Sequence, residues 1–378
     1  MNIVYCTDCI RGLGGIQRVT TAKASALAGI PGNRVWILVA DTSGRSLFPC
    51  SPEVQVMDLG IHYYEDDWKS KWHVLKGILL KRRLHRKRLK DTLHKIRPDI
   101  VISVGQSEKN ILPGIRGPWK TVREYHFARD YRRAHAASAF EKILAVAGDL
   151  YERVVTLRKY DRIVVLTHED RDSNWRGRDR VCVIPNPVIM DPQLSDLSSR
   201  RIIAVGRLER PKDFASLIRS FARVHEAHPD WELSIFGEGS QRELLLSLID
   251  GLNLRSAVSL KGTSKQISVE LAASSILAVS SKHEGQPLAL LEAMSCGLPV
   301  VAYACPCGPK DIITDGENGY LVTPGDEAML AQRMCQLIED VSFRRRMGKA
   351  ARERAEDFSM GSILPQWVAL FRELNAEA

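Results

Sequence analysis

The chain has 378 residues, which is too long for one hydrophobic core and predicts two domains of roughly 180 residues each. It has no run of about 18 apolar residues, and its first residues, MNIVYC, do not resemble a signal peptide. We therefore expect neither a membrane-spanning helix nor secretion. The charge is uneven, because residues 1–186 carry a net charge of +13 and residues 187–378 a net charge of −4. The first half should therefore meet an anionic partner.

The eight cysteines are spaced irregularly, which is typical of reduced thiols in a cytosolic protein. The pairs Cys6–Cys9 and Cys305–Cys307 lack a second CxxC motif or paired histidines that would complete a zinc set. We therefore expect no metal site at either pair.

Short β-branched runs alternate with longer helical patterns along both halves of the chain. In the first half, strands are expected in NIVYC, RVWILVA, VQVMDL, PDIVISVG, WKTVREYHF and DRIVVLT. A helix over residues 17–28 follows a Gly-rich loop, and a basic stretch over residues 76–97 has a helical pattern. In the second half, strands are expected in RIIAVG, WELSIF, VSLKG, SILAVS, PVVAY and YLVTP, with helices such as DFASLIRSFARVHEAH and EAMLAQRMCQLIED between them. This alternation predicts an α/β protein with two doubly wound, Rossmann-like parallel sheets.

Three prolines within residues 185–192 mark the connection between the halves. The predicted domains are therefore residues 1–186 and residues 187–360. Residues 361–378 form a final helix that we expect to pack back on the first domain. Ligands of such sheets bind beyond the carboxyl ends of the strands, so the functional residues should follow strands.

The stretch HEGQPLALLEAMSCGLPVVA contains two carboxylates, Glu284 and Glu292, around the start of a predicted helix. Pro287 suits the first helical position, so the free amides at Leu288 and Ala289 would offer a site for a phosphate. The two carboxylates would suit hydroxyl groups beside that phosphate. The alternative is that one carboxylate caps the helix and the other is a surface charge.

Three further motifs follow predicted strands of the second half. Arg207 and Lys212 lie on one loop after RIIAVG and could converge on a diphosphate, although a solvated basic loop is the alternative. Gly237 and Gly239 follow WELSIF, where a tight turn explains them equally well. Gly262 follows VSLKG and could let backbone groups approach a base.

In this order, the motifs resemble the family 4 glycosyltransferases, which have the GT-B architecture of two Rossmann-like domains facing a cleft. The resemblance implies that Glu284 binds donor-sugar hydroxyls, that Glu292 binds the ribose of the nucleotide, and that Arg207 and Lys212 neutralise the leaving diphosphate. Many members have Phe-Gly after the first Glu-Gly. Here Gln286 and Pro287 occupy these positions of the donor-binding loop.

The first half contributes a Gly-rich loop and a histidine. Gly12, Gly14 and Gly15 permit a loop that encloses an anionic ligand, or a plain flexible turn. In the resembled family this loop lies beside the donor diphosphate, and Gln17 stands where a Glu is usual. His126 ends a predicted strand, where it could be structural. The resemblance implies a site residue that hydrogen-bonds the sugar or an acceptor phosphate.

Residues 76–97 hold ten Lys and Arg and one acid, with Leu79, Leu89 and Leu93 on one predicted face. A basic amphipathic helix favours an anionic membrane surface, and the alternatives are a solvated helix or nucleic acid. Nucleic acid is not expected, because no aromatic stacking platform accompanies the charge. The combination resembles transferases that extend polyprenyl-diphosphate-linked glycans. The expected acceptor and membrane contacts are Arg82, Arg83, Arg86 and Lys87.

The sequence therefore predicts a cytoplasmic hexosyltransferase, peripheral on the inner face of the cell membrane. It would move a hexose or N-acetylhexosamine from a nucleotide sugar, UDP-linked, to a lipid-linked or cell-envelope glycan. As the resemblance implies, transfer should retain the anomeric configuration and need no metal or other cofactor. Two alternatives stay open, a nucleotide-sugar epimerase of the same fold and a non-enzymatic binding protein.

Overall fold

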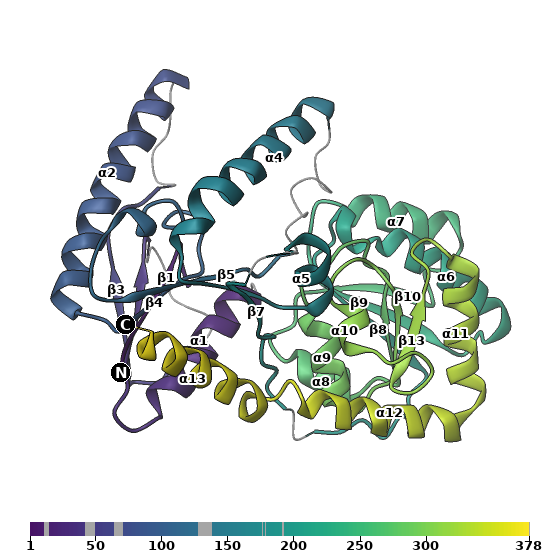
Figure 1. Cartoon of the computed structure of the whole chain (residues 1–378). Helices are drawn as coiled ribbons and strands as arrows, with labels where there is room; N and C mark the ends of the chain where they lie inside the picture. Colours follow the sequence, from purple (N-terminus) through teal and green to yellow (C-terminus); the bar gives the residue numbers. More distant parts are fainter. Residues whose placement is uncertain are drawn as a thin grey trace.

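The computed structural model describes residues 1–10, 15–41, 50–63, 71–127, 138–175, 177, 179–190 and 193–377. It consists of two Rossmann-like domains, each built on a parallel β-sheet with helices on both faces (Figure 1). The predicted fold class is confirmed.

The first sheet has seven strands in the order β3-β2-β1-β4-β5-β6-β7. All pairs are parallel, and the strands are short and rich in Val and Ile, as buried parallel strands require. Their bounds are β1 Asn2–Thr7, β2 Arg34–Val39, β3 Val54–Asp58, β4 Ile100–Ser103, β5 Lys120–Glu124, β6 Arg162–Val165 and β7 Val181–Val183. The edge strand β7 was not predicted, because three residues are too few for a period to be recognised.

The second sheet has six strands in the order β10-β9-β8-β11-β12-β13, again all parallel. Their bounds are β8 Arg201–Val205, β9 Glu232–Phe236, β10 Val258–Gly262, β11 Ile276–Val279, β12 Val300–Tyr303 and β13 Gly319–Val322. In both sheets the order reverses once, between β1 and β4 and between β8 and β11. The two reversals are where an open α/β sheet binds ligands.

The helices of the first domain are α1 Gly15–Ala28, α2 Lys71–Ile96, α4 Ala139–Tyr151 and α5 His168–Asn174. Those of the second domain are α6 Phe214–Ala227, α7 Arg242–Gly251, α8 Ile267–Ala272, α9 Leu288–Ser295, α10 Pro309–Ile312, α11 Glu327–Glu339 and α12 Val341–Glu356. The last helix is α13 Met360–Ala376. Short helical segments lie at Leu112–Gly114, Glu152–Thr156, Leu157–Lys159 and Arg210–Lys212.

Two apolar clusters cover the faces of the first sheet. On one face, Ile3 and Tyr5 of β1 pack with α1 and α13. On the other face, Val4 of β1 packs with Leu89 and Leu93 of α2. The alternation along β1 therefore feeds both clusters, as the period of two along a strand requires.

The chain returns to its first domain through α13, which lies beneath the first sheet in Figure 1. Trp367 and Phe371 of α13 are almost fully buried in the same cluster as Ile3 and Tyr5. The ammonium of the buried Lys23 lies 4.4 Å from the Trp367 ring centroid. The helix is therefore part of the first domain's core.

None of the eight cysteines forms a disulfide. Among the residues that the structure describes, no helix combines the length and the apolar character needed to cross a bilayer.

Candidate active site

The loops that follow β8, β9 and β11 are bonded to one another through their backbones. Leu208 donates its amide to the carbonyl of Glu238 at 2.9 Å, and Lys282 donates to the carbonyl of Pro211 at 2.8 Å. The loops after β8 and β11 leave the sheet at its reversal, and the loop after β9 lies next to them. The predicted donor residues after these strands therefore lie on one connected surface.

Lys212 and Glu284 come together at this surface. Lys212 ends the short helical turn after β8, and its ammonium lies 2.5 Å from a carboxylate oxygen of Glu284, which follows β11. Both side chains are largely buried, at 24% and 10% exposure. Arg207 lies on the same loop with an exposed side chain. The arrangement offers two cations and one carboxylate to a ligand that enters here.

Gly237, Gly239 and Gly262 serve close backbone packing. A Cβ on Gly237 would lie 1.8 Å from the carbonyl oxygen of Gly206, and a Cβ on Gly239 would lie 2.4 Å from that of Leu208. Gly237 and Gly262 also have φ values of +145° and +74°, which favour glycine. These glycines let the loops meet beneath Arg207 and Lys212.

Helix α9 begins at this surface. Pro287 is the residue before the helix, with an extended ψ of 94°, so the prediction that it is the first helical residue is wrong by one position. No side chain caps α9, whose first residues are Leu288 and Ala289. The first amides of a helix attract anions, so this end of α9 suits a phosphate.

Glu292 of α9 forms an ion pair with Arg18 of α1, across the seam between the two domains. Burial raises the pKa of Glu292, and the neighbouring Arg18 opposes that shift. At the same seam, a Cβ on Gly15 would lie 2.8 Å from a methyl carbon of Leu288. The start of α1 therefore faces the start of α9.

Sequence reasoning missed Arg18. The residue stands directly after Gln17, at the end of the Gly-rich motif, but no local pattern connects it with a carboxylate 274 residues away. Of the predicted glycines in this loop, Gly15 is the first residue of α1, whereas Gly12 and Gly14 lie outside the described residues.

His126 lies at the same seam, two residues after β5. Its side chain is 3% exposed, and its Nε2 atom lies 3.3 Å from a carboxylate oxygen of Glu124. Burial lowers the pKa of His126 to about 4, although Glu124 acts in the opposite direction. A Cβ on Gly285 would lie 2.5 Å from the carbonyl oxygen of His126. The backbone of the donor loop therefore packs closely against the backbone at His126.

A buried ion pair fixes the carboxylate that lies beside His126. Lys23 of α1 binds a carboxylate oxygen of Glu124, and both side chains are almost fully buried. Burial alone would raise the pKa of Glu124, but the charge and hydrogen bond of Lys23 hold it below its usual value. The carboxylate beside His126 is therefore ionised, and its position is fixed by α1.

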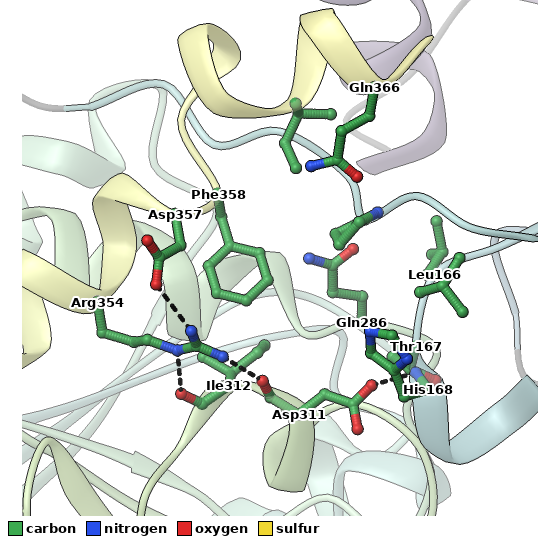
Figure 2. Close-up of a pocket in the computed structure, with 13 residues that line it drawn as sticks. Leu166, Thr167, His168, Gln286, Asp311, Ile312, Arg354, Asp357, Phe358 and Gln366 are labelled. Atoms are coloured by element: carbon green, nitrogen blue, oxygen red, sulfur yellow. Dashed lines mark hydrogen bonds and ion pairs between the residues drawn. The ribbon is translucent and has the colours of Figure 1, made fainter. Parts of the chain in front are cut away.

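Gln286 points away from the predicted donor surface. Its amide oxygen accepts from the backbone amide of Asn186 at 2.6 Å, and its amide nitrogen donates to the Asn186 carbonyl at 3.3 Å. Figure 2 shows Gln286 at a cavity of about 200 Å³ between the domains, where Asp311 bridges Arg354 and the backbone of His168. The side chain of Gln286 thus holds the connection between the domains.

The second half of helix α2 packs on the first sheet. Leu89 and Leu93 are fully buried, whereas Leu79 is 53% exposed, so the prediction of one apolar face that includes Leu79 is wrong. The first half of the helix extends beyond the sheet that would cover it (Figure 1). Of the predicted contact residues, Arg82, Arg83 and Lys87 have exposed side chains. Arg86 donates to the carbonyl of Gly114 at 2.8 Å.

Among the described residues, no three His, Cys, Asp or Glu side chains converge as a metal-binding group.

Comparison with known proteins identifies the second domain. The family model "Glycosyl transferases group 1" matches residues 187–354. An exopolysaccharide phosphotransferase of Streptomyces coelicolor is 38% identical over 57% of this chain and 23% of its own length. A glycosyltransferase of Methanocaldococcus jannaschii, whose function is uncharacterised, is 31% identical over 58% of this chain and 67% of its own length.

A third relative, from Campylobacter jejuni, is an N-acetylgalactosaminyltransferase that acts on a diphospho-undecaprenol glycan. It is 33% identical over 44% of this chain and 45% of its own length. The chain therefore spans less than two thirds of the Streptomyces and Campylobacter relatives. All three relatives are named as transferases, so the alternative of a nucleotide-sugar epimerase is not supported.

Solved structures share the fold over nearly the whole chain. Sucrose-phosphate synthase from Thermosynechococcus elongatus has a TM-score of 0.80 at 19% identity and covers 100% of both chains. TarM of S. aureus, solved with UDP, fondaparinux and α-GlcNAc-glycerol, has a TM-score of 0.76 at 16% identity. It covers 98% of this chain and 99% of its own. Both are GT-B glycosyltransferases, so the fold is GT-B.

Proposed function

The chain belongs to the group 1 glycosyl transferases, and we propose that it is a retaining hexosyltransferase of glycosyltransferase family 4. Its donor is a nucleotide sugar, UDP-linked, and its acceptor is a lipid-linked or cell-envelope glycan. The observation that carries this proposal is the ion pair of Lys212 with Glu284 at the mouth of α9. It joins a cation for a diphosphate to a carboxylate for sugar hydroxyls, at a reversal in strand order.

In the proposed step, the bond between C1 of the donor sugar and the diphosphate oxygen breaks, and its electron pair leaves with the diphosphate. The oxygen of the acceptor hydroxyl bonds to C1 from the same face, and its proton passes to the departing phosphate oxygen. Arg207, Lys212 and the first amides of α9 stabilise the negative charge that develops. We propose that these fixed charges act without a metal ion.

The two carboxylates would hold the neutral parts of the donor. Glu292 lies one turn inside α9, and we propose that it accepts hydrogen bonds from the ribose hydroxyls. Glu284 would accept from hydroxyls of the transferred sugar, exchanging its bond with Lys212 for bonds to the substrate. His126 is neutral at physiological pH and would hydrogen-bond the same sugar from the first domain.

Two findings support the donor and acceptor classes. TarM, which shares the fold, was solved with UDP, and the Campylobacter relative acts on an undecaprenol-linked glycan. The net charge of +13 on residues 1–186 also suits an acceptor that carries a lipid diphosphate. We propose that the protein works at the inner face of the cell membrane.

The proposal is tested by incubation with a panel of labelled UDP-, GDP- and ADP-sugars, with and without polyprenyl-diphosphate-linked acceptors. We expect label to move from one UDP-sugar to an acceptor, with the same anomeric configuration in product and donor, measured by NMR. Lys212→Ala should lower the rate of that transfer by about a hundredfold. Inverted product would overturn the retaining step, and absence of transfer with every donor would overturn the activity.

A further inference from the structure

Helix α4 exposes a row of large apolar side chains. Ile143 is 66% exposed and Leu150 is 59% exposed, which is unusual for side chains of this size. The other exposed members are Leu144, Val146 and Tyr151. At about 100° per residue, these five side chains fall within one arc of about 160°. They form a continuous outer face, called here the α4 face.

The opposite side of α4 faces the protein and carries small or acidic residues. Ala145, Gly148 and Asp149 are half-buried. Glu152, which follows the helix on this side, is buried, and its carboxylate lies 2.8 Å from the ammonium of Lys109. A surface helix of a globular protein normally turns its apolar side inward. Helix α4 has the reverse orientation, so its apolar side is available to a partner.

Helix α2 rises from the same layer of the first domain. Leu89 of α2 and Leu157, which follows α4, both pack on the face of the sheet opposite α1. In Figure 1 both helices extend away from the sheet on the same side. The exposed surface of α2 holds the cations Arg82, Arg83, Lys87 and Lys90, and also exposed apolar side chains, Leu79, Leu80 and Leu84.

We propose that the α4 face enters an anionic lipid bilayer and that the cations of α2 hold the headgroups beside it. An apolar surface accompanied by clustered Lys and Arg is what an anionic membrane interface binds. A second copy of the chain fits less well, because pairing the α4 faces would bring two cationic α2 helices together. Membrane binding would bring the active site close to a lipid-linked acceptor, and this consequence rests on the proposed function. The binding of the α4 face to a bilayer does not rest on it.

Vesicle flotation tests the proposal. Full-length protein is mixed with vesicles of phosphatidylcholine alone, or with phosphatidylglycerol added, over a range of salt concentrations. Ile143, Leu144, Leu150 and Tyr151 are replaced together by Ser. We expect binding to the anionic vesicles to fall by at least about tenfold at every salt concentration, because the buried apolar area is lost.

Two further variants separate the contributions. Replacing Arg82, Arg83, Lys87 and Lys90 together by Gln should remove the preference for anionic vesicles and the dependence on salt. The matched control replaces four exposed apolar residues of the second domain by Ser, namely Leu244, Leu252, Val269 and Val341. That control should float like the wild type.

Two results with the α4 variant would overturn the proposal. One is wild-type flotation of the α4 variant. The other is a change of oligomeric state without a change in flotation. If the wild type sediments as an oligomer and the α4 variant as a monomer, the α4 face is an interface between copies. A UDP thermal shift in each variant reports the donor site separately. Flotation without UDP binding would contradict the proposed function alone, and UDP binding without flotation would contradict the docking alone.

Discussion

Arg18 and Glu292 lie 274 residues apart in the sequence and form an ion pair between the two domains. The pair joins the first turn of α1, directly after the Gly-rich loop, to the helix that begins the proposed phosphate site. The first domain therefore contributes a charge that acts on the proposed ribose carboxylate.

Arg18→Gln should weaken donor binding, and more so at low pH. Burial raises the pKa of Glu292, and Arg18 opposes this shift, so its removal should raise the pKa further. Because a carboxylate is ionised only above its pKa, the variant loses the ionised form at a higher pH than the wild type does. The donor KM of the variant relative to wild type should therefore be larger at pH 6 than at pH 8, with kcat little changed. Steady-state kinetics at both pH values measures this.

Arg18→Lys should restore most of the donor affinity, and Glu292→Gln should raise KM equally at both pH values. Lys310→Gln is the matched control, because it removes another ion pair between the domains, that of Lys310 with Glu169 at 2.9 Å. If the KM ratio of Arg18→Gln were the same at pH 6 and pH 8, Arg18 would not act through the charge of Glu292.

Arg207→Ala and Lys212→Ala should each lower kcat by about a hundredfold, or about 3 kcal/mol, because each removes a stabilising group from the leaving diphosphate. Lys212→Ala also leaves Glu284 without its ion-pair partner. Lys282→Ala is the control, since Lys282 is close in sequence to Glu284 but pairs with Asp213 at 2.9 Å and is 56% exposed. Equal rates in all three variants would remove the cations from the chemistry.

Transfer should continue in excess EDTA, because on the proposed mechanism protein cations and helix amides neutralise the diphosphate. The measurement is the initial rate after dialysis against EDTA, with and without added Mg²⁺ or Mn²⁺. A strict requirement for either ion would mean that the diphosphate is bound in another way.

His126 should remain neutral throughout the range of pH in which the enzyme works. Burial lowers its pKa to about 4, so the imidazole gains a proton only well below pH 5. The ratio of kcat/KM between wild type and His126→Asn should therefore be constant from pH 5.5 to pH 8. A ratio that changes around pH 6.5 would show that the histidine titrates with its ordinary pKa and that its burial has little effect.

Gly285→Ala should lower the transfer rate by separating the domains. Its new Cβ would lie 2.5 Å from the carbonyl oxygen of His126, and backbone atoms on both sides must shift. Gly251→Ala has nothing within 4 Å of the added carbon and serves as the control. Small-angle scattering would report the separation. If Gly285→Ala had wild-type kinetics and wild-type scattering, the close contact between Gly285 and His126 would not set the distance between the domains.

The sequence predicts the fold and the location of the site because both depend on local signals. The β-branched runs of β1 and β8 have the length and composition of buried parallel strands. The residues that follow such strands meet at one edge of a sheet, so Lys212 and Glu284 could be expected to lie close together.

Other features depend on how distant segments pack, and no local pattern reveals them. The bonds of Gln286 to Asn186 and of Arg18 to Glu292 require the relative placement of two domains. The apolar pattern of α2 did not show that Leu79 lies beyond the sheet that would cover it. Helix α4 was not predicted, and the buried contact of Glu152 with Lys109 on its inward side joins residues that are 43 apart in the sequence.

Helix α13 constrains the order in which the two domains can be completed. Trp367 and Phe371 complete the core around β1, which begins at Asn2, so the first domain cannot close until the last helix has been synthesised. On the ribosome, the second domain is able to fold while the first sheet still lacks α13 on one of its faces. A chimera that exchanges donor domains between relatives should therefore keep α13 with the amino-terminal half, although the two are adjacent only in space.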